Sequence, residues 1–365
     1  MEDNDDTASA SAYPDTAQLA SGFKHWPNHR HGEVLETYEV IRKYKQGYAG
    51  AFIDPVAREQ FYSRILAAGG SMDGEQIAYN NQFAGSGEGK LSIPFIYAFK
   101  HWPKCWPCPG QTTGDCVSHG GKNSALVLIG VESALKEPDP DTGLVEDYPV
   151  VSELGEAQGV VACENIYRAR GHSGQGANCS SLQDYVTSKG GILLRQKYPE
   201  LDLDLEKYNA SIGIPGGKGV PESWNQEGKK HQIRTATGAS SPENVRDFVA
   251  NGYPIWVCSG LGWSSTRDEN GYSRQQGGWG HSWVVMGYDD RDIIKQKYGG
   301  PLFLYNHDWG NWNRGGTRIM GTEIDIPGGS FWADAKLLNR CECTAMSNMN
   351  GWPARILPPI QIDVG

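Results

Sequence analysis

The stretch "GQTTGDCVSHGGKNSALVLIG", residues 110–130, places one cysteine, Cys116, between a polar glycine-rich loop and an apolar segment. The residues after Cys116 predict a helix to about Lys136, because a proline follows shortly and disfavours helical backbone before it. The middle of this helix is apolar almost all round, so we expect it in the core. Gly120 and Gly121 weaken a helix by roughly 1 kcal/mol each against alanine, which indicates that another segment approaches closely there.

The composition of the 365-residue chain is that of a globular protein with one large domain or two smaller ones. The net charge is −10 and lysine and arginine form no cluster, so we expect no nucleic-acid partner. No stretch approaches the ~20 apolar residues of a membrane span, and the first residues lack the pattern of a secretory signal. We therefore expect no membrane association, and a protein that is cytoplasmic or carried in a particle.

The pattern of residue types divides the chain into residues 1–22, 23–94, 95–335 and 336–365. The first part is acidic and rich in small polar residues, which is typical of a flexible tail. The second contains two predicted helices and is an accessory or pro-like segment, and a candidate surface for protein assembly. The third is mostly helical over about 110–200 and mostly strand over about 240–335, which predicts an α+β molecule. The fourth is a C-terminal extension expected to pack back on this domain.

Eight cysteines are too few for a disulfide scaffold in a chain of this length. Two local pairs make a candidate zinc site if the ends of the domain meet, namely Cys105, Cys108, Cys341 and Cys343. Zinc ribbons usually use two Cys-x-x-Cys pairs, whereas the second pair here is Cys-x-Cys. Disulfides or buried thiols are therefore the preferred interpretation, and we expect no metal and no cofactor.

A cysteine at the start of a helix is a candidate nucleophile, because the helix dipole favours its thiolate. Such a thiol also needs an imidazole nearby to accept its proton. Among the nine histidines, His281 fits best, since it stands in "GGWGHSWVVMGYDD" (277–290) where glycines give way to an apolar run. A surface histidine at the start of a strand is the alternative interpretation. His119, three residues after Cys116, is expected to face another direction.

Further along, the predicted strand "FLYNHDWG" (303–310) ends in polar residues beside a tryptophan. Its candidates for orienting the imidazole are Asn306, His307 and Asp308. An amide or carboxylate there would accept the other ring N–H of His281, which fixes its tautomer.

In this order, the motifs resemble those of the papain family of cysteine peptidases: "QTTGDC" (111–116), "HSWVVMGY" (281–288) and "NHDWGNW" (306–312). Residues 178–202 and 243–260 are similar to two further segments of that family. The resemblance covers roughly residues 95–335. It implies a papain-like two-lobed fold, in which a helical lobe and an antiparallel β-barrel-like lobe enclose an active-site cleft.

The resemblance also implies a hydrolase that cleaves peptide or amide bonds in a peptide or protein substrate through a thioester acyl-enzyme. Cys116 would be the nucleophile and His281 the general base and acid. Gln111 would donate a hydrogen bond from its side-chain amide to the oxyanion, beside the Cys116 backbone N–H. A donor of this kind lowers the activation barrier by about 3 kcal/mol.

Asn306 would orient His281, and Trp309 would shield their hydrogen bond from water. An ungapped count back from Trp309 selects His307 instead, because the family pattern is one residue shorter here. We prefer Asn306 by residue type, with Asp308 second.

Several residues depart from the family pattern. Gln111 is five residues before Cys116, where papain has six, and Val117 replaces the usual tryptophan. Asp115 places a negative charge beside the thiol and is expected to raise its pKa. The position of a family disulfide cysteine holds Thr113, so we expect Cys163 and Cys179 to pair with each other or to stay reduced.

Two other classes of function remain open. The first is a papain-fold structural or virion-associated protein with weak or no catalysis, which the departures above favour. The second is a peptidoglycan-directed Cys-His amidase or endopeptidase, or a transglutaminase. These use the same residue order, but their cysteine-to-histidine interval is usually much shorter than the 165 residues (281 − 116) found here.

Overall fold

The structure is a computed structural model that describes residues 51–52, 54–67, 74–102, 110–135, 160–231, 233–306, 308–310, 317–347, 352 and 354–357. The expected tail at 1–22 and residues 23–50, 53 and 68–73 of the accessory segment lie outside this part of the chain. So do Cys105, Cys108 and His307.

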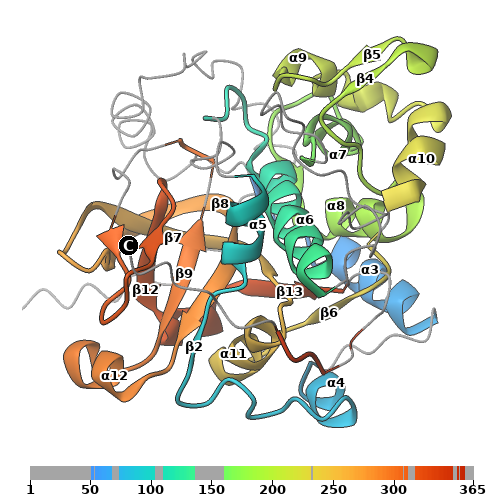
Figure 1. Ribbon diagram of the computed structural model, residues 1–365. Coiled ribbons are helices and arrows are strands. Elements are labelled where there is room, and N and C mark those ends of the chain that lie inside the picture. Colours follow the sequence, from blue (N-terminus) through green and yellow to red (C-terminus); the bar gives the residue numbers. More distant parts are fainter. Residues whose placement is uncertain are drawn as a thin grey trace, which may run out of the picture.

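One side of the molecule is a seven-stranded antiparallel sheet (Figure 1). Its strands are β2 (Leu91–Ser92), β6 (Ala236–Gly238), β7 (Ile255–Arg267), β8 (Ser273–Asp289), β9 (Leu302–Asn306), β12 (Ser330–Asp334) and β13 (Glu342–Met346). Their order is β12-β9-β8-β7-β13-β6, and β2 pairs with β8 off this path. The two longest strands, β7 and β8, place Ser259 opposite His281 in their register. β12 and β6 are the two ends of this order, and within the described residues no strand pairing joins them to close the sheet into a barrel.

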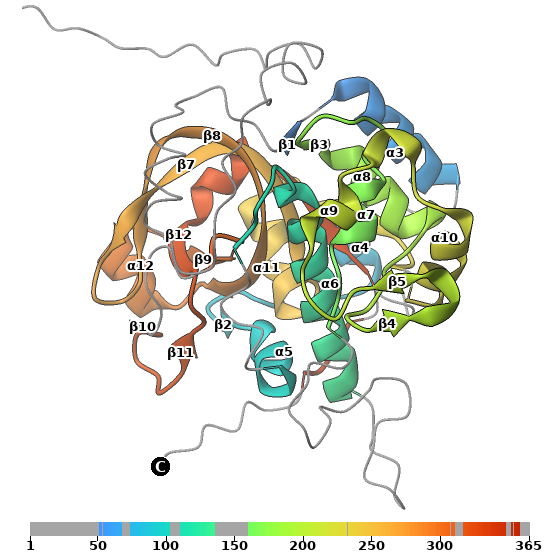
Figure 2. The ribbon, with the colours of Figure 1, turned by 90° about the horizontal axis from the view of Figure 1, so that it is seen from above.

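Most of the helices lie on the other side, as Figure 2 shows from above. The α-helices are α3 (Pro55–Ala67), α4 (Gly74–Asn80), α5 (Phe95–His101), α6 (Cys116–Leu135), α7 (Glu164–Arg168), α8 (Cys179–Asp184), α9 (Ala210–Gly213), α10 (Glu222–Gly228), α11 (Pro242–Ala250) and α12 (Asp292–Tyr298). Helical turns of other types are η2 (Tyr185–Lys189), η3 (Pro199–Leu201), η4 (Gly216–Lys218), η5 (Lys229–His231) and η6 (Ala335–Arg340). The separation of helices from an antiparallel sheet confirms the α+β prediction.

Three short strand pairs complete the fold. They join β1 (Ala51–Phe52) to β3 (Ala177–Asn178), β4 (Lys197–Tyr198) to β5 (Leu203–Asp204), and β10 (Thr317–Arg318) to β11 (Asp325–Ile326). Through β1 and β2, described residues of the 23–94 segment pair with both sides of the molecule.

Helix α6 is the central helix and packs against β7 and β8. Every residue from Cys116 to Ser133 is buried, which confirms the expectation of a core helix. A Cβ on Gly120 would lie 2.6 Å from Ser282 Oγ, and one on Gly121 would lie 2.6 Å from the Trp256 ring. The two glycines therefore allow the close approach that the sequence indicated.

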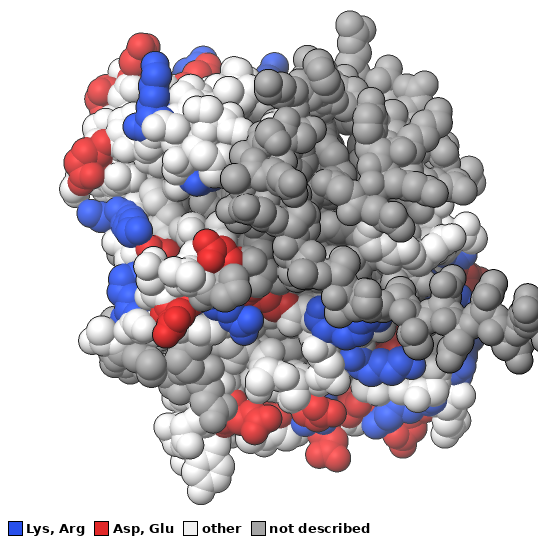
Figure 3. Space-filling view, turned by 180° about the vertical axis from the view of Figure 1, so that it is seen from behind, with Lys and Arg blue, Asp and Glu red and all other residues white. Residues whose placement is uncertain are grey.

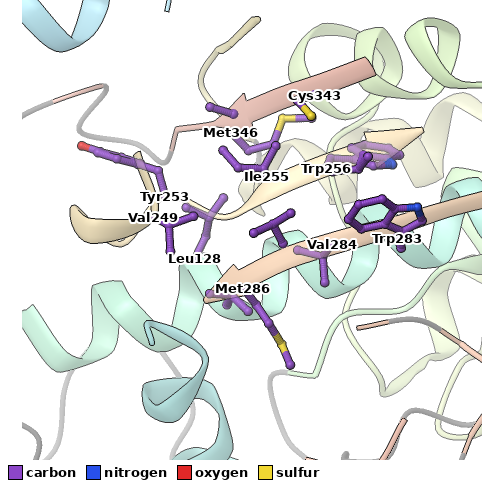
Figure 4. Close-up of a cluster of buried hydrophobic side chains, with 14 of the residues drawn as sticks. Leu128, Val249, Tyr253, Ile255, Trp256, Trp283, Val284, Met286, Cys343 and Met346 are labelled. Carbon is purple, nitrogen blue, oxygen red and sulfur yellow. The ribbon is translucent and has the colours of Figure 1, made fainter. Parts of the chain in front are cut away.

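The core fills the space between α6, α11 and the sheet (Figure 4). Its buried side chains include Leu128, Val249, Ile255, Trp256, Trp283, Val284 and Met286. Burying one side chain of this size contributes roughly 1.5–3 kcal/mol, so this contact fixes the helical side against β8.

A disulfide between Cys179 and Cys258 joins the start of α8 to β7, with a Cα–Cα distance of 6.5 Å. The expected pairing of Cys163 with Cys179 is therefore wrong. The alternative expectation, that both stay reduced, holds for Cys163, which is a free buried thiol, and fails for Cys179. The physical reason is that α8 begins against β7, whereas Cys163 stands at the start of α7 beside His119.

The described surface shows lysine, arginine and acidic side chains interspersed on the face seen from behind (Figure 3). None of the described helices has the length and apolar character that a membrane crossing requires.

Candidate active site

Cys116 is the first residue of α6, and its side chain is only 1% exposed. The backbone N–H of Ser282, the residue that follows His281 on β8, lies near the sulfur and lowers the pKa of the thiol. The fold therefore brings the predicted nucleophile to the strand that carries the predicted base.

The charge state of this thiol follows from its surroundings. Burial raises the pKa of Cys116 most, and the negative charges of Asp308 and Asp115 raise it further, while the Ser282 N–H lowers it. The expected effect of Asp115 is confirmed. The thiol is thus protonated at neutral pH.

His281 is 3% exposed and lies against Trp309, with ring centroids 4.6 Å apart and planes at 32°. Burial lowers the pKa of His281 to about 4, against the opposing effect of the nearby Asp308 carboxylate. The imidazole is therefore neutral at neutral pH, which is the form that accepts a proton.

The orienting candidates lie at the end of β9. Asn306 donates through Nδ2 to Ser330 Oγ at 2.9 Å, and its Oδ1 accepts from Asn123 Nδ2 at 3.2 Å. The same Asn123 group donates to Asp308 Oδ1 at 2.9 Å. Asn306 and Asp308 are both fully buried, and the charge of Asp308 acts on His281. His307 lies outside the described residues.

Asn123 was not among the residues that the sequence singled out. It follows Cys116 by seven residues, which is two helical turns and therefore the same face of α6. This spacing was the available signal, but only the fold shows that β9 ends against that face.

Gln111 connects the loop before Cys116 to the residues after β9. Its Oε1 accepts from Trp309 Nε1 at 3.0 Å, and its backbone N–H donates to the Asp308 carbonyl oxygen at 2.7 Å. Its Nε2 donates to the Thr113 carbonyl oxygen at 2.7 Å. A side-chain amide has two N–H groups, so Nε2 carries one N–H besides the one that faces Thr113.

A buried polar cluster lies next to this site, around His119. Its Nε2 is 3.3 Å from Asp115 Oδ2 and 3.5 Å from Cys163 Sγ, and its Nδ1 is 3.3 Å from Asp308 Oδ1. Burial alone lowers the pKa of His119, but the charges of Cys163, Asp308 and Asp115 raise it well above its ordinary value. The four-residue spacing of Asp115 and His119 was the only local signal for this cluster.

For the candidate zinc site, the structure describes two of the four thiols. Cys341 Sγ donates to the Leu337 carbonyl oxygen at 3.5 Å, and Cys343 Sγ donates to that of Leu338 at 3.9 Å. Because Cys105 and Cys108 lie outside the described residues, this site stays a prediction.

No family model matches the sequence, and a comparison with curated protein sequences finds no match. Among solved structures, the chain is similar to xylellain, a cysteine protease from Xylella fastidiosa, at 13% identity and a TM-score of 0.40, over 66% of this chain and 82% of that one. It is also similar to digestive procathepsin L 3 of Tenebrio molitor larval midgut, at 13% identity and a TM-score of 0.35, over 86% and 98% of the two chains. A third similar structure is the proform of the Amb a 11 cysteine protease, a ragweed pollen allergen, at 14% identity and a TM-score of 0.38, over 88% and 99%.

Proposed function

We propose that the protein is a papain-like cysteine-dependent hydrolase that cleaves peptide or amide bonds through a thioester on Cys116. The observation that carries this proposal is the position of the Cys116 thiol beside the Ser282 backbone N–H, which lowers the pKa of that thiol. The thiol stands at the N-terminus of a 20-residue helix, beside the residue next to His281. A helix N-terminus and an adjacent imidazole are the two features that activate a cysteine nucleophile.

His281 acts as base and then as acid in this mechanism. The thiol and the imidazole are both neutral at rest, so the proton moves from sulfur to the ring as the carbon–sulfur bond forms. The imidazolium then protonates the leaving amine. In the second half, His281 takes a proton from the water that attacks the thioester. The carbon–sulfur bond then breaks to release the acid, and the imidazolium returns the proton to the sulfur.

Two donors stabilise the negative oxygen that develops during both steps. One is the Cys116 backbone N–H, which has no partner within its own helix because it belongs to the first turn. The other is the second N–H of the Gln111 amide, whose oxygen Trp309 holds. A donor of this kind contributes about 3 kcal/mol to lowering the barrier.

Asp308 stabilises the imidazolium form of His281, because its charge already raises the pKa of that ring in the resting state. Asn306 remains a candidate for orienting the ring. Its hydrogen bonds to Asn123 and Ser330 support a role in holding the end of β9 in place.

The test is labelling with a thiol-directed epoxide, followed by mass spectrometry and an assay with a denatured protein substrate. Wild-type protein is expected to take up one label at Cys116 and to cleave the substrate. Cys116→Ala is expected to lose both, while Cys341→Ala keeps both. Unchanged labelling of Cys116→Ala would remove this residue from the mechanism.

The second candidate function is a papain-fold structural protein with weak or no catalysis. The burial of both Cys116 and His281 favours it, since a substrate must reach both groups. A wild-type protein that neither reacts with the epoxide nor cleaves any substrate would support this alternative.

A further inference from the structure

Next to the proposed nucleophile, a carboxylate, an imidazole and a thiol converge. Asp115 and His119 lie one turn apart at the start of α6, and Cys163 stands directly before α7. One ligand atom from each lies within 4.8 Å of the other two, and all three residues are buried. Three chemically different metal-ligating groups, drawn from two helix starts, thus meet at one point.

The two distances from His119 Nε2 to the other two groups are those of ligands that share one ion. His119 Nε2 lies 3.3 Å from Asp115 Oδ2 and 3.5 Å from Cys163 Sγ. In a tetrahedral zinc site, bonds of about 2.1 Å to nitrogen or oxygen and about 2.3 Å to sulfur set nitrogen and oxygen about 3.4 Å apart, and nitrogen and sulfur about 3.6 Å apart.

A second ring of groups holds these ligands. Asp308 Oδ1 lies 3.3 Å from His119 Nδ1, the arrangement in which a carboxylate fixes a metal-binding imidazole with its Nε2 toward the ion. The Tyr208 hydroxyl donates to Asp115 Oδ2 at 2.7 Å. Arg195 donates to Cys163 Sγ at 3.8 Å.

The charges balance with a divalent cation in place. A carboxylate, a thiolate and a neutral imidazole carry two negative charges together, which one divalent ion neutralises. Lys122 Nζ lies 3.3 Å from His119 Nδ1, and its positive charge balances the negative charge of Asp308. Arg195 pairs with Glu164 at 2.6 Å.

One oxygen of the cluster also lacks a partner. Asp115 Oδ1 is buried and has no hydrogen-bond partner in the part of the chain that the structure describes. A buried carboxylate oxygen without a partner is costly, and a cation bound through both oxygens of Asp115 would supply the missing interaction.

We propose that Asp115, His119 and Cys163 bind one zinc ion, with a fourth position for water or the Tyr208 hydroxyl. The ion ties the start of α6 to the start of α7. It also neutralises Asp115, whose charge otherwise opposes ionisation of the neighbouring Cys116 thiol. Its ligands are other residues than those of the cysteine pairs considered above, and it does not depend on whether the protein is a hydrolase.

The test uses the full chain with Cys116→Ser, so that the proposed catalytic thiol cannot bind metal, and cobalt(II) as a spectroscopic probe for zinc. One equivalent of cobalt is expected to give a thiolate-to-cobalt charge-transfer band and the visible bands of a tetrahedral site. Adding Cys163→Ser is expected to remove the charge-transfer band, whereas adding Cys343→Ser leaves it unchanged. Asp308→Asn is expected to weaken binding 10–100-fold, because it removes the group that holds the imidazole.

A charge-transfer band that survives Cys163→Ser, or a chain that binds neither cobalt nor zinc, would overturn the proposal. X-ray absorption at the zinc edge does not depend on whether the Cys163 variant folds. For the zinc-loaded Cys116→Ser chain it is expected to show one sulfur and otherwise nitrogen or oxygen ligands. Four sulfur ligands would assign the ion to the other cysteines instead.

Discussion

The indole of Trp309 lies across the imidazole of His281, with ring centroids 4.6 Å apart. The same indole donates its N–H to Gln111 Oε1 at 3.0 Å. One side chain therefore connects the proposed base to the proposed oxyanion donor, and a change in it acts on both.

Trp309→Phe keeps an aromatic ring over His281 but removes the N–H. The Gln111 amide oxygen then loses its donor, and leaving a buried acceptor unsatisfied costs about 1–3 kcal/mol. We expect the free energy of unfolding in urea to fall by that amount and kcat/KM to fall about 10-fold, because the amide is less firmly held. In a double-mutant cycle with Gln111→Ala, the two effects on kcat/KM are expected to be less than additive. Additive effects would show that Trp309 does not act through Gln111.

Asp308 and Asn306 are distinguished by comparing Asp308→Asn with Asn306→Ala. Asp308→Asn removes the charge that raises the pKa of His281, so the imidazolium intermediate is less stable. We expect kcat to fall roughly 100-fold or more and the basic requirement in the pH–rate profile to move to lower pH. Asn306→Ala removes hydrogen bonds to Asn123 and Ser330, which is expected to lower the free energy of unfolding by about 1–3 kcal/mol and to leave the profile in place. The opposite pattern, in a folded Asn306→Ala protein, would assign the orienting role to Asn306.

The parts of the site that the sequence predicted are those with a local signal. Cys116 was recognisable from a glycine-rich loop followed by a long apolar run, and the structure starts α6 at that residue. His281 was recognisable from glycines that give way to an apolar run, and it lies within β8. Gly120 and Gly121 indicated a close approach, although not that Ser282 and Trp256 make it.

The parts that sequence reasoning missed depend on contacts between distant segments. Asn123 contacts Asp308 across 185 positions, and Cys163 contacts His119 across 44. The partner of Cys179 was predicted wrongly, because the spacing of cysteines does not determine which of them the fold brings together.

Gly121→Ala tests whether the helix–sheet contact behind the site tolerates one added methyl group. The new Cβ would lie 2.6 Å from the ring of Trp256, which is fully buried and donates its N–H to Ser282 Oγ at 2.9 Å. Overpacking of this kind costs about 1–3 kcal/mol, which outweighs the gain of about 1 kcal/mol in helix propensity. We therefore expect a lower urea midpoint, and a lower kcat because α6 moves away from β8. Gly300→Ala is the matched control, since no described atom lies within 4 Å of its Cβ position. A Gly121→Ala protein more stable than wild type would contradict this packing.

The buried neutral state of His281 predicts how the stability of the protein depends on pH. In the unfolded chain the ring has its ordinary pKa of 6.5, whereas burial lowers it to about 4 in the folded protein. As the pH falls from 6.5 towards 4, the unfolded state binds a proton before the folded state does, so the free energy of unfolding decreases. The free energy of unfolding therefore has its full value above pH 6.5. The difference between the two pKa values corresponds to a loss of about 3 kcal/mol of this free energy by pH 4.

His281→Gln removes the titrating ring but keeps a polar side chain of similar size. Other groups titrate in both proteins, so the informative quantity is the difference in the free energy of unfolding between wild type and variant. Urea unfolding at pH values from about 7.5 to about 4 is expected to show wild type losing about 3 kcal/mol more than the variant over this range. Parallel curves would mean that His281 keeps an ordinary pKa. A solvent-exposed ring has such a pKa. An exposed His281 would contradict the packing of its ring beneath Trp309.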